Sequence, residues 1–565
     1  MAEWQRTHTC GELREEHVGQ TVVLNGWVNT TRVYNDQAFV DLRDRYGITQ
    51  VVFEADDREL FEAAKEVGRE WVLSVRGTVR RRLPDKTNPK LATGAVEVKA
   101  GSLRVLNRCP TPPFEVTEFP GEELAGEDLR LQYRYLDLRR PSAQRTLMLR
   151  HRMNSAIRCY FDRHGFVEIE TPLLGRSTPE GARDYLVPSR LYHGQWYALP
   201  QSPQLYKQLL MVAGFDKYYQ IARCLRDEDQ RADRQPEFTQ LDLEMSFVEA
   251  EDVMRVTEGM AVEVFREVVG VELPAPFPRL SYAEAMLKYG SDKPDLRFGL
   301  EIVELTDMAR DCGFKIFQDA AASGQKVRGL NVKGGAGRLS NTELNKGWVV
   351  EYARQFGAKG LAWLKTEGGR FTGSIEKNFT EPAKQTLRER FGVEDGDLLL
   401  FVADTEAVVC HALGSLRTRL AAELGLYTNW WERRQRYEEE LDQYYKDLKA
   451  GRPATEPEPF RLTAEDFKVF WVVDFPQFLF DPEENRYVAN HHPFTAPRDE
   501  DLPLLESDPA RVRAKAYDLV INGYEIGGGS IRIHDPEVQR RMFRAVGMTE
   551  EQARQRFGFL LDALQ

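Results

Sequence analysis

The sequence predicts a multidomain α+β protein, and three observations lead to that prediction. Its 565 residues exceed what one hydrophobic core serves, since domains average about 150 residues. Short alternating strands fill the first hundred residues, whereas strands and helices alternate from about residue 132 to residue 278. Residues 299–425 are richer in Gly, Ala and Lys, which indicates an inserted α/β domain.

Composition excludes several classes of protein. Hydrophobic residues make up 42% of the chain, and its 30 Phe, 21 Tyr and 9 Trp argue against disorder throughout. No run of 18 apolar residues predicts a membrane span, and the polar N-terminus carries no signal-peptide core. The six cysteines stand singly, so we expect neither a disulfide framework nor a thiolate zinc site, and we expect a cytoplasmic protein. The net charge of −12 says little about partners, because it leaves room for local basic faces.

The first domain, residues 1–108, is expected to contain five strands. The expected strands cover residues 22–29, 38–42, 48–53, 71–79 and 95–106. A helix is expected between the third and fourth strands, at residues 56–67. Five strands in about 90 residues fit a small closed barrel of the oligonucleotide-binding type, although periodicity alone leaves other small β-barrels open.

Shifts in composition predict the remaining boundaries. A Pro-rich hinge is expected at residues 109–131. A second domain in two parts, 132–290 and 467–565, encloses an inserted domain at 291–426. Residues 427–466 predict a charged helix and a Pro-rich linker, for which a solvated surface helix is the simplest interpretation. In the second part, the almost wholly apolar residues 467–480 predict one central strand.

Residues 223–247 carry a dense mixture of arginine and acidic side chains. Arg226, Asp227 and Glu228 are expected in a loop between two antiparallel strands. An exposed charged hairpin would also explain such a run, but the flanking strands are too apolar for a solvated face. Arginine on a buried strand must be paired, since an isolated buried charge is costly.

A second block lies far downstream, at residues 517–534. Asp518, Glu525 and Arg532 follow one another at intervals of seven, with a glycine triplet at 527–529. Glycines in a strand mark a bulge or a close approach by a ligand. Two carboxylates near each other on a sheet suit a divalent cation that carries phosphates. His491 and His492 would be a metal pair in another interpretation, but adjacent residues of an extended segment point apart, so we expect no metal there.

Together these blocks resemble the catalytic core of class II aminoacyl-tRNA synthetases, and specifically the bacterial aspartyl type. Residues 165–172 (GFVEIETP) are similar to motif 1 of that class, and residues 225–247 are similar to motif 2. Further segments resemble sequences particular to the aspartate enzymes: 134–140, 178–182, 201–207, 490–495 and 523–530. The resemblance runs from about residue 7 to the C-terminus, apart from residues 427–460.

The resemblance implies a fold and a reaction. Members of the family join an oligonucleotide-binding barrel to a catalytic domain built on an antiparallel sheet. They activate L-aspartate with ATP, which gives aspartyl-adenylate and pyrophosphate, and then esterify the terminal adenosine of tRNA. The implied partners are ATP, Mg²⁺, L-aspartate, the tRNA for aspartate and a second copy of the chain, with the tRNA for asparagine left open. Because the α-carboxylate of the amino acid is the nucleophile, positioning and electrostatics carry the rate without a protein base.

The resemblance also implies the site residues. The implied catalytic residues are Arg226, Glu228 and Arg532. The residues implied for ATP are Arg226, Asp227, Glu228, Gln235 and Glu525, and those implied for Mg²⁺ are Asp518 and Glu525. The residues implied for aspartate are Glu180, Gln204, Lys207, Arg226, Asp242, His491 and Arg532.

Arg532 has a defined task in this scheme. It would take the side-chain carboxylate of aspartate bidentately, with support from Lys207. Asp242 and Gln204 would take the ammonium group. Asparagine is then rejected because the two cations would stay unpaired, and the same cations disfavour lysine.

In the barrel, Phe39, Gln50 and Glu97 fall on the family's anticodon-binding positions. An aromatic face that stacks a splayed base and polar groups that read base edges suit single-stranded RNA. From alternation alone, however, a core position is the stronger expectation for Phe39. The arginine-rich turn of the family is reduced here to Arg32, which leaves the choice between the tRNAs for aspartate and asparagine open.

The sequence ends before motif 3, a Gly-rich segment that carries an arginine for the γ-phosphate in the family. We expect an ordinary enzyme that is cut short. The alternative is a catalytically inactive paralogue that serves as an RNA-binding or interaction module. Retention of Arg226, Glu228, Asp518, Glu525 and Arg532 favours the enzyme.

Overall fold

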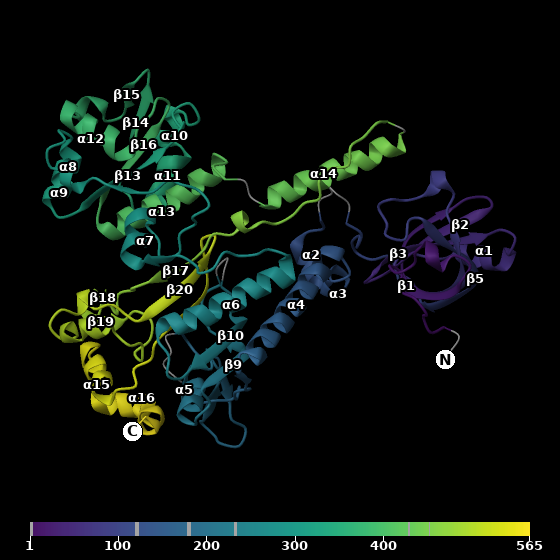
Figure 1. The fold of residues 1–565 in the computed structure, drawn as a ribbon, viewed down its shortest axis with the longest axis horizontal. Helices are drawn as coiled ribbons and strands as arrows, with labels where there is room; N and C mark the ends of the chain where they lie inside the picture. Colours follow the sequence, from purple (N-terminus) through teal and green to yellow (C-terminus); the bar gives the residue numbers. More distant parts are fainter. Residues whose placement is uncertain are drawn as a thin grey trace. The chain divides into compact units, whose positions relative to one another are not determined.

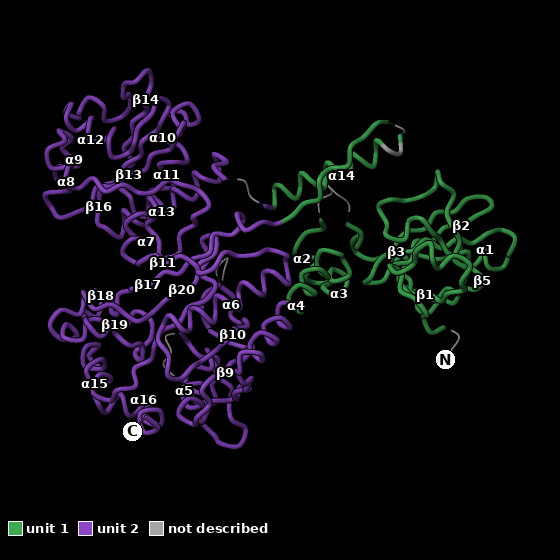
Figure 2. Tube along the Cα trace, viewed as in Figure 1, with its two compact units in different colours: residues 1–152, 431–461 green, residues 153–430, 462–565 purple. Residues whose placement is uncertain are grey.

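The computed structural model describes residues 4–118, 124–177, 182–230, 234–427, 430–450 and 452–564, without the side chains of Leu448 and Lys449. The chain forms two compact units (Figure 2). One comprises residues 1–152 and 431–461, and the other comprises residues 153–430 and 462–565. In the described part of the chain, no helix is long and apolar enough to cross a membrane.

A closed five-stranded barrel forms the N-terminal part of the first unit, in the strand order β1-β2-β3-β5-β4 (Figure 1). Its strands are β1 (Thr21–Val33), β2 (Gln37–Asp44), β3 (Gly47–Glu54), β4 (Val72–Arg81) and β5 (Val96–Asn107). Helix α1 (Arg58–Lys65) follows β3, and Asp57 caps it by accepting a hydrogen bond from the backbone N–H of Leu60. Two short 3₁₀ turns accompany the barrel, at Glu15–His17 and Pro84–Lys86. The expected strands and helix are confirmed.

Alternation along β2 determines which side chains enter the barrel. Ala38, Val40 and Leu42 are buried in its core, and Phe39 is half-buried outside that core. The expectation that Phe39 is foremost a core residue is wrong, because its two neighbours occupy the inward positions of the strand.

Four helices complete the first unit: α2 (Glu127–Gln132), α3 (Arg134–Asp137), the start of α4 (Pro141–Arg163) and almost all of α14 (Trp430–Lys449). The basic segment after the hinge is helical as expected, and so is the charged segment after the insert. Arg140 joins α3 to the hinge, because its guanidinium pairs with the fully buried Asp137 and with Glu118. Helix α14 contacts the barrel through Lys90, whose Nζ donates to Asp442 Oδ1 at 2.5 Å.

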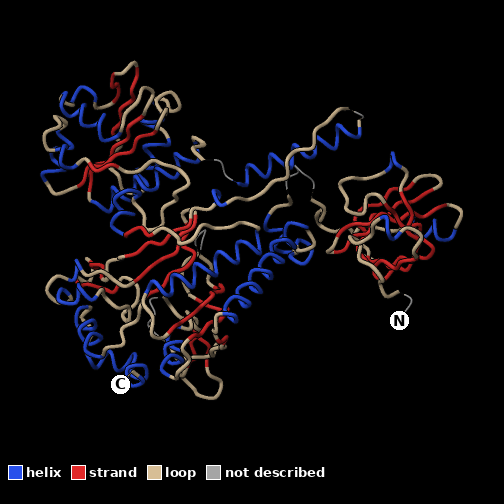
Figure 3. Tube along the Cα trace, viewed as in Figure 1, coloured by secondary structure: helices blue, strands red, loops and turns tan. Residues whose placement is uncertain are grey.

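The second unit is built around two mainly antiparallel sheets, whose strands are red in Figure 3. The three-stranded sheet has the order β10-β9-β6, from β10 (Glu237–Met245), β9 (Lys217–Leu225) and β6 (Val167–Glu168). The four-stranded sheet has the order β11-β17-β20-β21, from β11 (Arg279–Ser281), β17 (Val469–Val473), β20 (Ala516–Ile521) and β21 (Tyr524–Ser530). Helix α6 (Ala250–Val269) packs on the second sheet, where Met254 and Ala261 share a core with Trp471, Tyr517 and Leu519.

Smaller elements surround these sheets. Two hairpins are formed by β7 (Leu186–Pro188) with β8 (Trp196–Ala198), and by β18 (Phe478–Asp481) with β19 (Arg486–Ala489). The helices are α5 (Gln204–Val212), α7 (Tyr282–Tyr289), α15 (Pro536–Ala545) and α16 (Glu550–Ala563). Short 3₁₀ turns lie at Ala464–Asp466, Asp499–Leu504 and Pro509–Arg511.

The prediction of one central strand over residues 467–480 is wrong. Strand β17 is central, but it ends at Val473, and β18 begins a separate two-stranded sheet at Phe478. Asp474 has a φ of +59°, which an extended strand does not allow, and Pro476 has no N–H to donate to a ladder. Apolar composition hides both interruptions.

An inserted α/β domain contains a five-stranded antiparallel sheet in the order β12-β13-β16-β14-β15. Its strands are β12 (Val303–Glu304), β13 (Lys326–Val332), β14 (Ala362–Glu367), β15 (Arg370–Gly373) and β16 (Leu398–Asp404). Its helices are α8 (Thr306–Ala309), α9 (Lys315–Ala322), α10 (Asn341–Lys346), α11 (Trp348–Gln355), α12 (Glu381–Phe391) and α13 (Glu406–Glu423), with a 3₁₀ turn at Glu376–Asn378. Separate apolar clusters form on the two faces of the sheet.

Candidate active site

Arg226 begins the connection between β9 and β10, as the charge pattern predicts. The two strands are antiparallel, with Leu225 opposite Glu237. The backbone N–H of Arg226 donates to Pro236 O at 2.8 Å, and its guanidinium lies 5.2 Å from the centre of the Phe238 ring. Arg226 Nε is buried without a hydrogen-bond partner among the described residues. Arg226 is therefore held by its backbone hydrogen bond and by the Phe238 ring, and its Nε–H remains available as a donor to a ligand.

Lys207 of α5 is buried beside two carboxylates of β10. Its Nζ donates to Asp242 Oδ1 at 2.6 Å and lies 3.4 Å from Glu244 Oε2. Burial alone would lower the pKa of Lys207, but the two carboxylates raise it above its ordinary value. The side chain therefore stays charged in this buried position.

Arg532 follows β21 and contacts the same helix. Its Nη2 donates to Gln204 Oε1 at 2.7 Å, and its Nη1 lies 3.5 Å from Thr495 Oγ1. Both Arg532 Nε and Gln204 Nε2 are buried without a partner in the described ranges. Since unsatisfied buried donors are rare, these groups are typical of a site that is completed by an acceptor-rich ligand.

The two histidines lie at this cluster but contact different rings. His491 meets Phe475 edge-on at 4.9 Å, whereas His492 stacks on Phe494 at 5.4 Å. Burial, and then the charges of Arg532 and Lys207, lower the pKa of His492 to about 3, so its ring is neutral at neutral pH. The described residues contain no group of three or more His, Cys, Asp or Glu side chains suited to a metal ion.

Asp518 and Glu525 lie on the hairpin of β20 and β21. Asp518 is opposite Gly528 and Val520 is opposite Glu525, while Leu519 is opposite Gly527, so Ile526 is the extra residue of a β-bulge. The bulge expected at the glycines is therefore found beside them. Burial, and then the charges of Glu525 and Asp292, raise the pKa of Asp518 to about 8. Such crowded carboxylates fit a divalent cation, which would relieve their mutual repulsion.

The sequence motifs assign no role to residues 291–300, which we call the 291–300 segment. Two of its side chains act electrostatically on Asp518. Asp292 raises the pKa of Asp518, and Lys293 opposes that effect. Asp292 acts on His491 as well, where loss of hydration and Arg532 lower the pKa and Asp292 raises it. The only signal in the sequence is a short run of alternating charge, which is common on protein surfaces.

The remaining predicted residues are not joined to this cluster. Glu180 lies outside the described residues. Asp227, Glu228 and Gln235 are exposed, and the carboxylate of Glu228 lies 3.7 Å from Arg234. Within the described ranges, no hydrogen bond or ion pair links these three side chains to Arg532 or Lys207.

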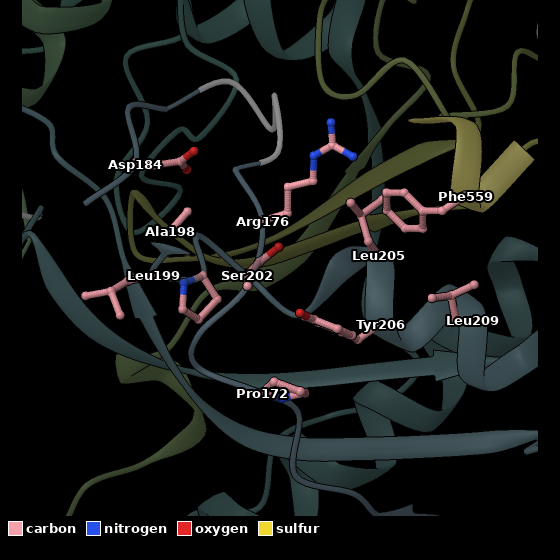
Figure 4. A pocket seen from close by; sticks show the side chains of 12 residues that line it. Pro172, Arg176, Asp184, Ala198, Leu199, Ser202, Leu205, Tyr206, Leu209 and Phe559 are labelled. Atoms are coloured by element: carbon pink, nitrogen blue, oxygen red, sulfur yellow. The ribbon is translucent and has the colours of Figure 1, made fainter. Parts of the chain in front are cut away.

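A cavity of about 260 Å³ lies on another side of α5 (Figure 4). Its lining includes Arg176, Asp184, Leu205, Tyr206 and Phe559. None of the predicted site residues within the described ranges lines it. The cavity is therefore distinct from the cluster of charged groups.

On the barrel, Gln50 and Glu97 are joined by a hydrogen bond of 2.8 Å from Gln50 Nε2 to Glu97 Oε2. Arg32 donates to Gln50 Oε1 at 3.0 Å, and its guanidinium lies 6.0 Å from the centre of the Phe39 ring. Arg80 completes the group through a bond of 2.8 Å from its Nε to Glu97. An aromatic ring, an amide and several charges thus share one surface of the barrel.

Family comparisons agree with this fold. Residues 126–565 match the tRNA synthetases class II (D, K and N), and residues 22–106 match the OB-fold nucleic acid binding domain. An aspartyl-tRNA synthetase from Entamoeba histolytica has a TM-score of 0.54 at 18% identity, over 100% of this chain and 85% of that one. An asparaginyl-tRNA synthetase from Pyrococcus horikoshii has a TM-score of 0.55 at 19% identity, over 99% and 89%. At these identities the two structures inform on the fold alone. The barrel, the antiparallel catalytic sheet and the site define the class as that of the class II aminoacyl-tRNA synthetases.

Curated relatives narrow the class. An aspartate–tRNA ligase from Geobacillus kaustophilus is 50% identical over 562 residues, which cover 99% of this chain and 88% of that protein. An aspartate–tRNA(Asp/Asn) ligase from Moorella thermoacetica is 51% identical over 565 residues, 100% of this chain and 87% of that protein. This chain belongs to the family of the bacterial aspartate–tRNA ligases. The resemblance inferred from the motifs is confirmed, and the comparisons give no support to the alternative of an inactive binding module.

Proposed function

We propose that this chain activates L-aspartate with ATP and transfers the aspartyl group to tRNA, in the cytoplasm, where it supplies protein synthesis. The observation that carries the proposal is a pair of cations, the buried Lys207 and the half-buried Arg532, in one cluster with Gln204 and Asp242. Lys207 is bound by Asp242 and Arg532 by Gln204, the two residues expected to bind the ammonium group of aspartate. The cluster therefore offers positive and negative ends to a small zwitterion that carries an additional carboxylate.

Recognition of aspartate follows from these charges. Arg532 presents a planar fork that matches a carboxylate, and Lys207 adds a second positive charge. Asp242 and Gln204 offer oxygens to the ammonium group. Glu180 and His491 would complete the site. An amide in place of the side-chain carboxylate would leave Arg532 without a counter-charge, so asparagine is disfavoured.

Activation of aspartate requires little covalent chemistry from the protein. Arg226 would hold the α-carboxylate beside the α-phosphate, and it would neutralise charge as the new P–O bond forms. Asp227, Glu228 and Gln235 would bind ATP from the same loop. Asp518 and Glu525 would hold Mg²⁺, which when bound would neutralise phosphate charge. The crowding that raises the pKa of Asp518 supports this assignment.

Binding of tRNA would use the barrel. Phe39 lies outside the barrel core, where its ring can stack on a splayed base. Gln50 and Glu97 would read base edges. We propose the tRNA for aspartate as the substrate, and we leave the tRNA for asparagine to the test below.

We also propose the domain limits expected from the sequence: a barrel at 1–108, a hinge at 109–131, a catalytic domain at 132–290 and 467–565, an insert at 291–426 and a helical linker at 427–466.

The test is aspartate-dependent exchange of pyrophosphate into ATP, followed by charging of the two tRNAs. We expect exchange with aspartate and a rate lower by at least about a hundredfold with asparagine or lysine, since a site built for a charged partner strongly rejects an analogue that lacks it. Aspartylation of purified tRNAs for aspartate and asparagine then defines the tRNA range. No exchange with any of the three amino acids would contradict the proposed activity.

A second copy of the chain is the proposed partner of an exposed apolar edge. Strand β6 pairs only with β9 among the described strands, and Val167, Leu173 and Leu174 are exposed along it and after it. A monomer rarely leaves such neighbouring apolar groups in water. We expect the chain to sediment at twice the mass of one copy and Leu173→Glu to raise the dimer dissociation constant at least about tenfold, because it buries a charge at the interface.

Sedimentation equilibrium of the variant measures this effect. The matched control is Leu191→Glu, at another exposed leucine, which is not part of β6 or the residues that follow it. A monomeric wild-type chain would contradict the dimer, and equal effects of the two variants would contradict this placement of the interface.

A further inference from the structure

Arg417 on α13 is a buried cation whose hydrogen-bond acceptors, among the described residues, are all backbone oxygens. It is 1% exposed, and no carboxylate of the described residues lies within ion-pair distance of it. Its Nη2 donates to Asp295 O at 3.0 Å and to Gly299 O at 3.1 Å, and its Nε donates to Leu300 O at 3.2 Å. All three acceptors belong to the 291–300 segment.

The cost of this arrangement is considerable, because an unpaired charge loses its hydration on burial. Burial lowers the pKa of Arg417 to about 10, so the side chain is still charged at neutral pH. The rings of Phe298 and Tyr289 partly compensate, with centres 4.6 and 4.9 Å from the guanidinium carbon. If this side chain only filled space, the fold would be more stable with an uncharged side chain at position 417. The charge therefore serves to fix the three carbonyl groups.

The 291–300 segment lies against the hairpin that carries Asp518 and Glu525. Leu296 packs against the apolar cluster that contains Ala516 and Val520, the residues on either side of Asp518 on one face of β20. The hairpin turn touches the segment as well, because a Cβ built on Gly523 would lie 3.2 Å from Asp295 Cβ. The segment therefore lies beside the hairpin that bears Asp518.

Asp292 and Lys293 are the charged residues of this segment that act electrostatically on Asp518. Lys293 brings a positive charge to the place where the phosphates of ATP are expected, and Asp292 adds a negative charge beside Asp518. Their positions depend on the segment, and Arg417 ties the segment to helix α13. Within the segment, Arg297 pairs with Asp295, and its guanidinium lies 4.5 Å from the centre of the Tyr427 ring.

We propose that Arg417 is a positioning residue of the adenylate-forming site: from helix α13 it holds the 291–300 segment so that Asp292 and Lys293 lie near Asp518. The inference rests on the proposed function. It assigns the inserted domain a part in activation, although none of the residues implied for aspartate or ATP belongs to that domain.

The test compares Arg417→Met with Arg328→Met. Arg328 is the matched control, because it is 2% exposed in the same domain but pairs with Glu304 and Glu406, neither of which belongs to the 291–300 segment. Arg417→Lys keeps the charge and is the rescue variant. Exchange is measured per folded molecule at varied Mg²⁺, ATP and aspartate, and hydrogen–deuterium exchange is measured for the peptide that contains residues 291–300.

We expect Arg417→Met to lower the kcat of exchange about tenfold and to raise the Mg²⁺ concentration for half-maximal rate at least about threefold. The KM for aspartate should stay within about twofold of the wild type, because α5 and β10 do not contact Arg417. Amide exchange in residues 291–300 should accelerate, and Arg417→Lys should restore part of each property. Arg328→Met should lower thermal stability and leave the kinetic constants unchanged.

Wild-type kinetics in Arg417→Met, unchanged amide exchange of the segment, or equal kinetic losses in Arg328→Met would each overturn the inference. An active wild-type enzyme with an unaffected Arg417→Met variant overturns this inference alone. A wild-type chain without exchange overturns the proposed function, and this inference with it.

Discussion

An Arg532→Gln variant should lose at least about a thousandfold in kcat/KM for aspartate in pyrophosphate exchange. Glutamine keeps a polar side chain, which is shorter, and removes the charge and the planar fork. The side-chain carboxylate of aspartate would then meet Lys207 alone, and Lys207 is already paired with Asp242 at 2.6 Å. The cost of removing water from the side-chain carboxylate of aspartate would no longer be offset by an arginine. The loss in kcat/KM should therefore come mainly from weaker binding of aspartate.

Arg540→Gln provides the control for this substitution. Arg540 lies on α15, exposed to solvent, and pairs with Glu537 one turn away. Exposed pairs of this kind contribute little, so exchange should stay within about twofold of the wild type. Undiminished aspartate activation by Arg532→Gln would refute the role assigned to Arg532.

A Gly528→Ala variant should lower the kcat of exchange about a hundredfold and raise the Mg²⁺ requirement, with little change in the fold. A Cβ on Gly528 would lie 2.2 Å from Asp518 Oδ1, closer than atoms can approach. Since the main chain on the other side is fixed by the ladder to β20, the carboxylate must turn away. Displacement of one of two metal-binding carboxylates disrupts a site that depends on their geometry.

The neighbouring Gly527 gives a close control. A Cβ built there meets no atom within 4 Å, so Gly527→Ala adds the same methyl group without the clash. Rates for the two variants are compared over a series of Mg²⁺ concentrations, with thermal denaturation as a check on folding. If Gly528→Ala and Gly527→Ala behave alike, the crowding of Asp518 does not limit activity.

Much of this fold could be predicted because local pattern and packing agree. The barrel strands alternate in period two, and β9 and β10 flank a charged loop that cannot be part of a core. The central strand at residues 467–480 was predicted too long, since apolar composition does not report the φ of Asp474. Likewise, alternation within β2 does not say which of its two faces is inward, and so Phe39 was assigned to the wrong one.

Residues of the candidate site could be predicted from the sequence only where they lie within recognisable motifs. Residues of α5, β10 and the segment after β21 come together at the predicted positions, as Lys207, Asp242 and Arg532 illustrate. The 291–300 segment was missed because its role depends on the carbonyl groups that Arg417 binds. Backbone acceptors have no signature in a sequence, and the two partners are more than a hundred residues apart.

The β-bulge at Ile526 also explains how the interval of seven between Glu525 and Arg532 is compatible with one site. Asp518 and Glu525 share a face because Glu525 is opposite Val520 in the hairpin, but side chains seven residues apart on one regular strand point to opposite faces. The extra residue restores even parity after Glu525, so Ser530 shares the face of Asp518, and Arg532 follows two residues later. The number of residues between Glu525 and Arg532 can therefore change only by an even number. A change by one residue would separate the carboxylates from the arginine, whereas a change by two would keep them on one side.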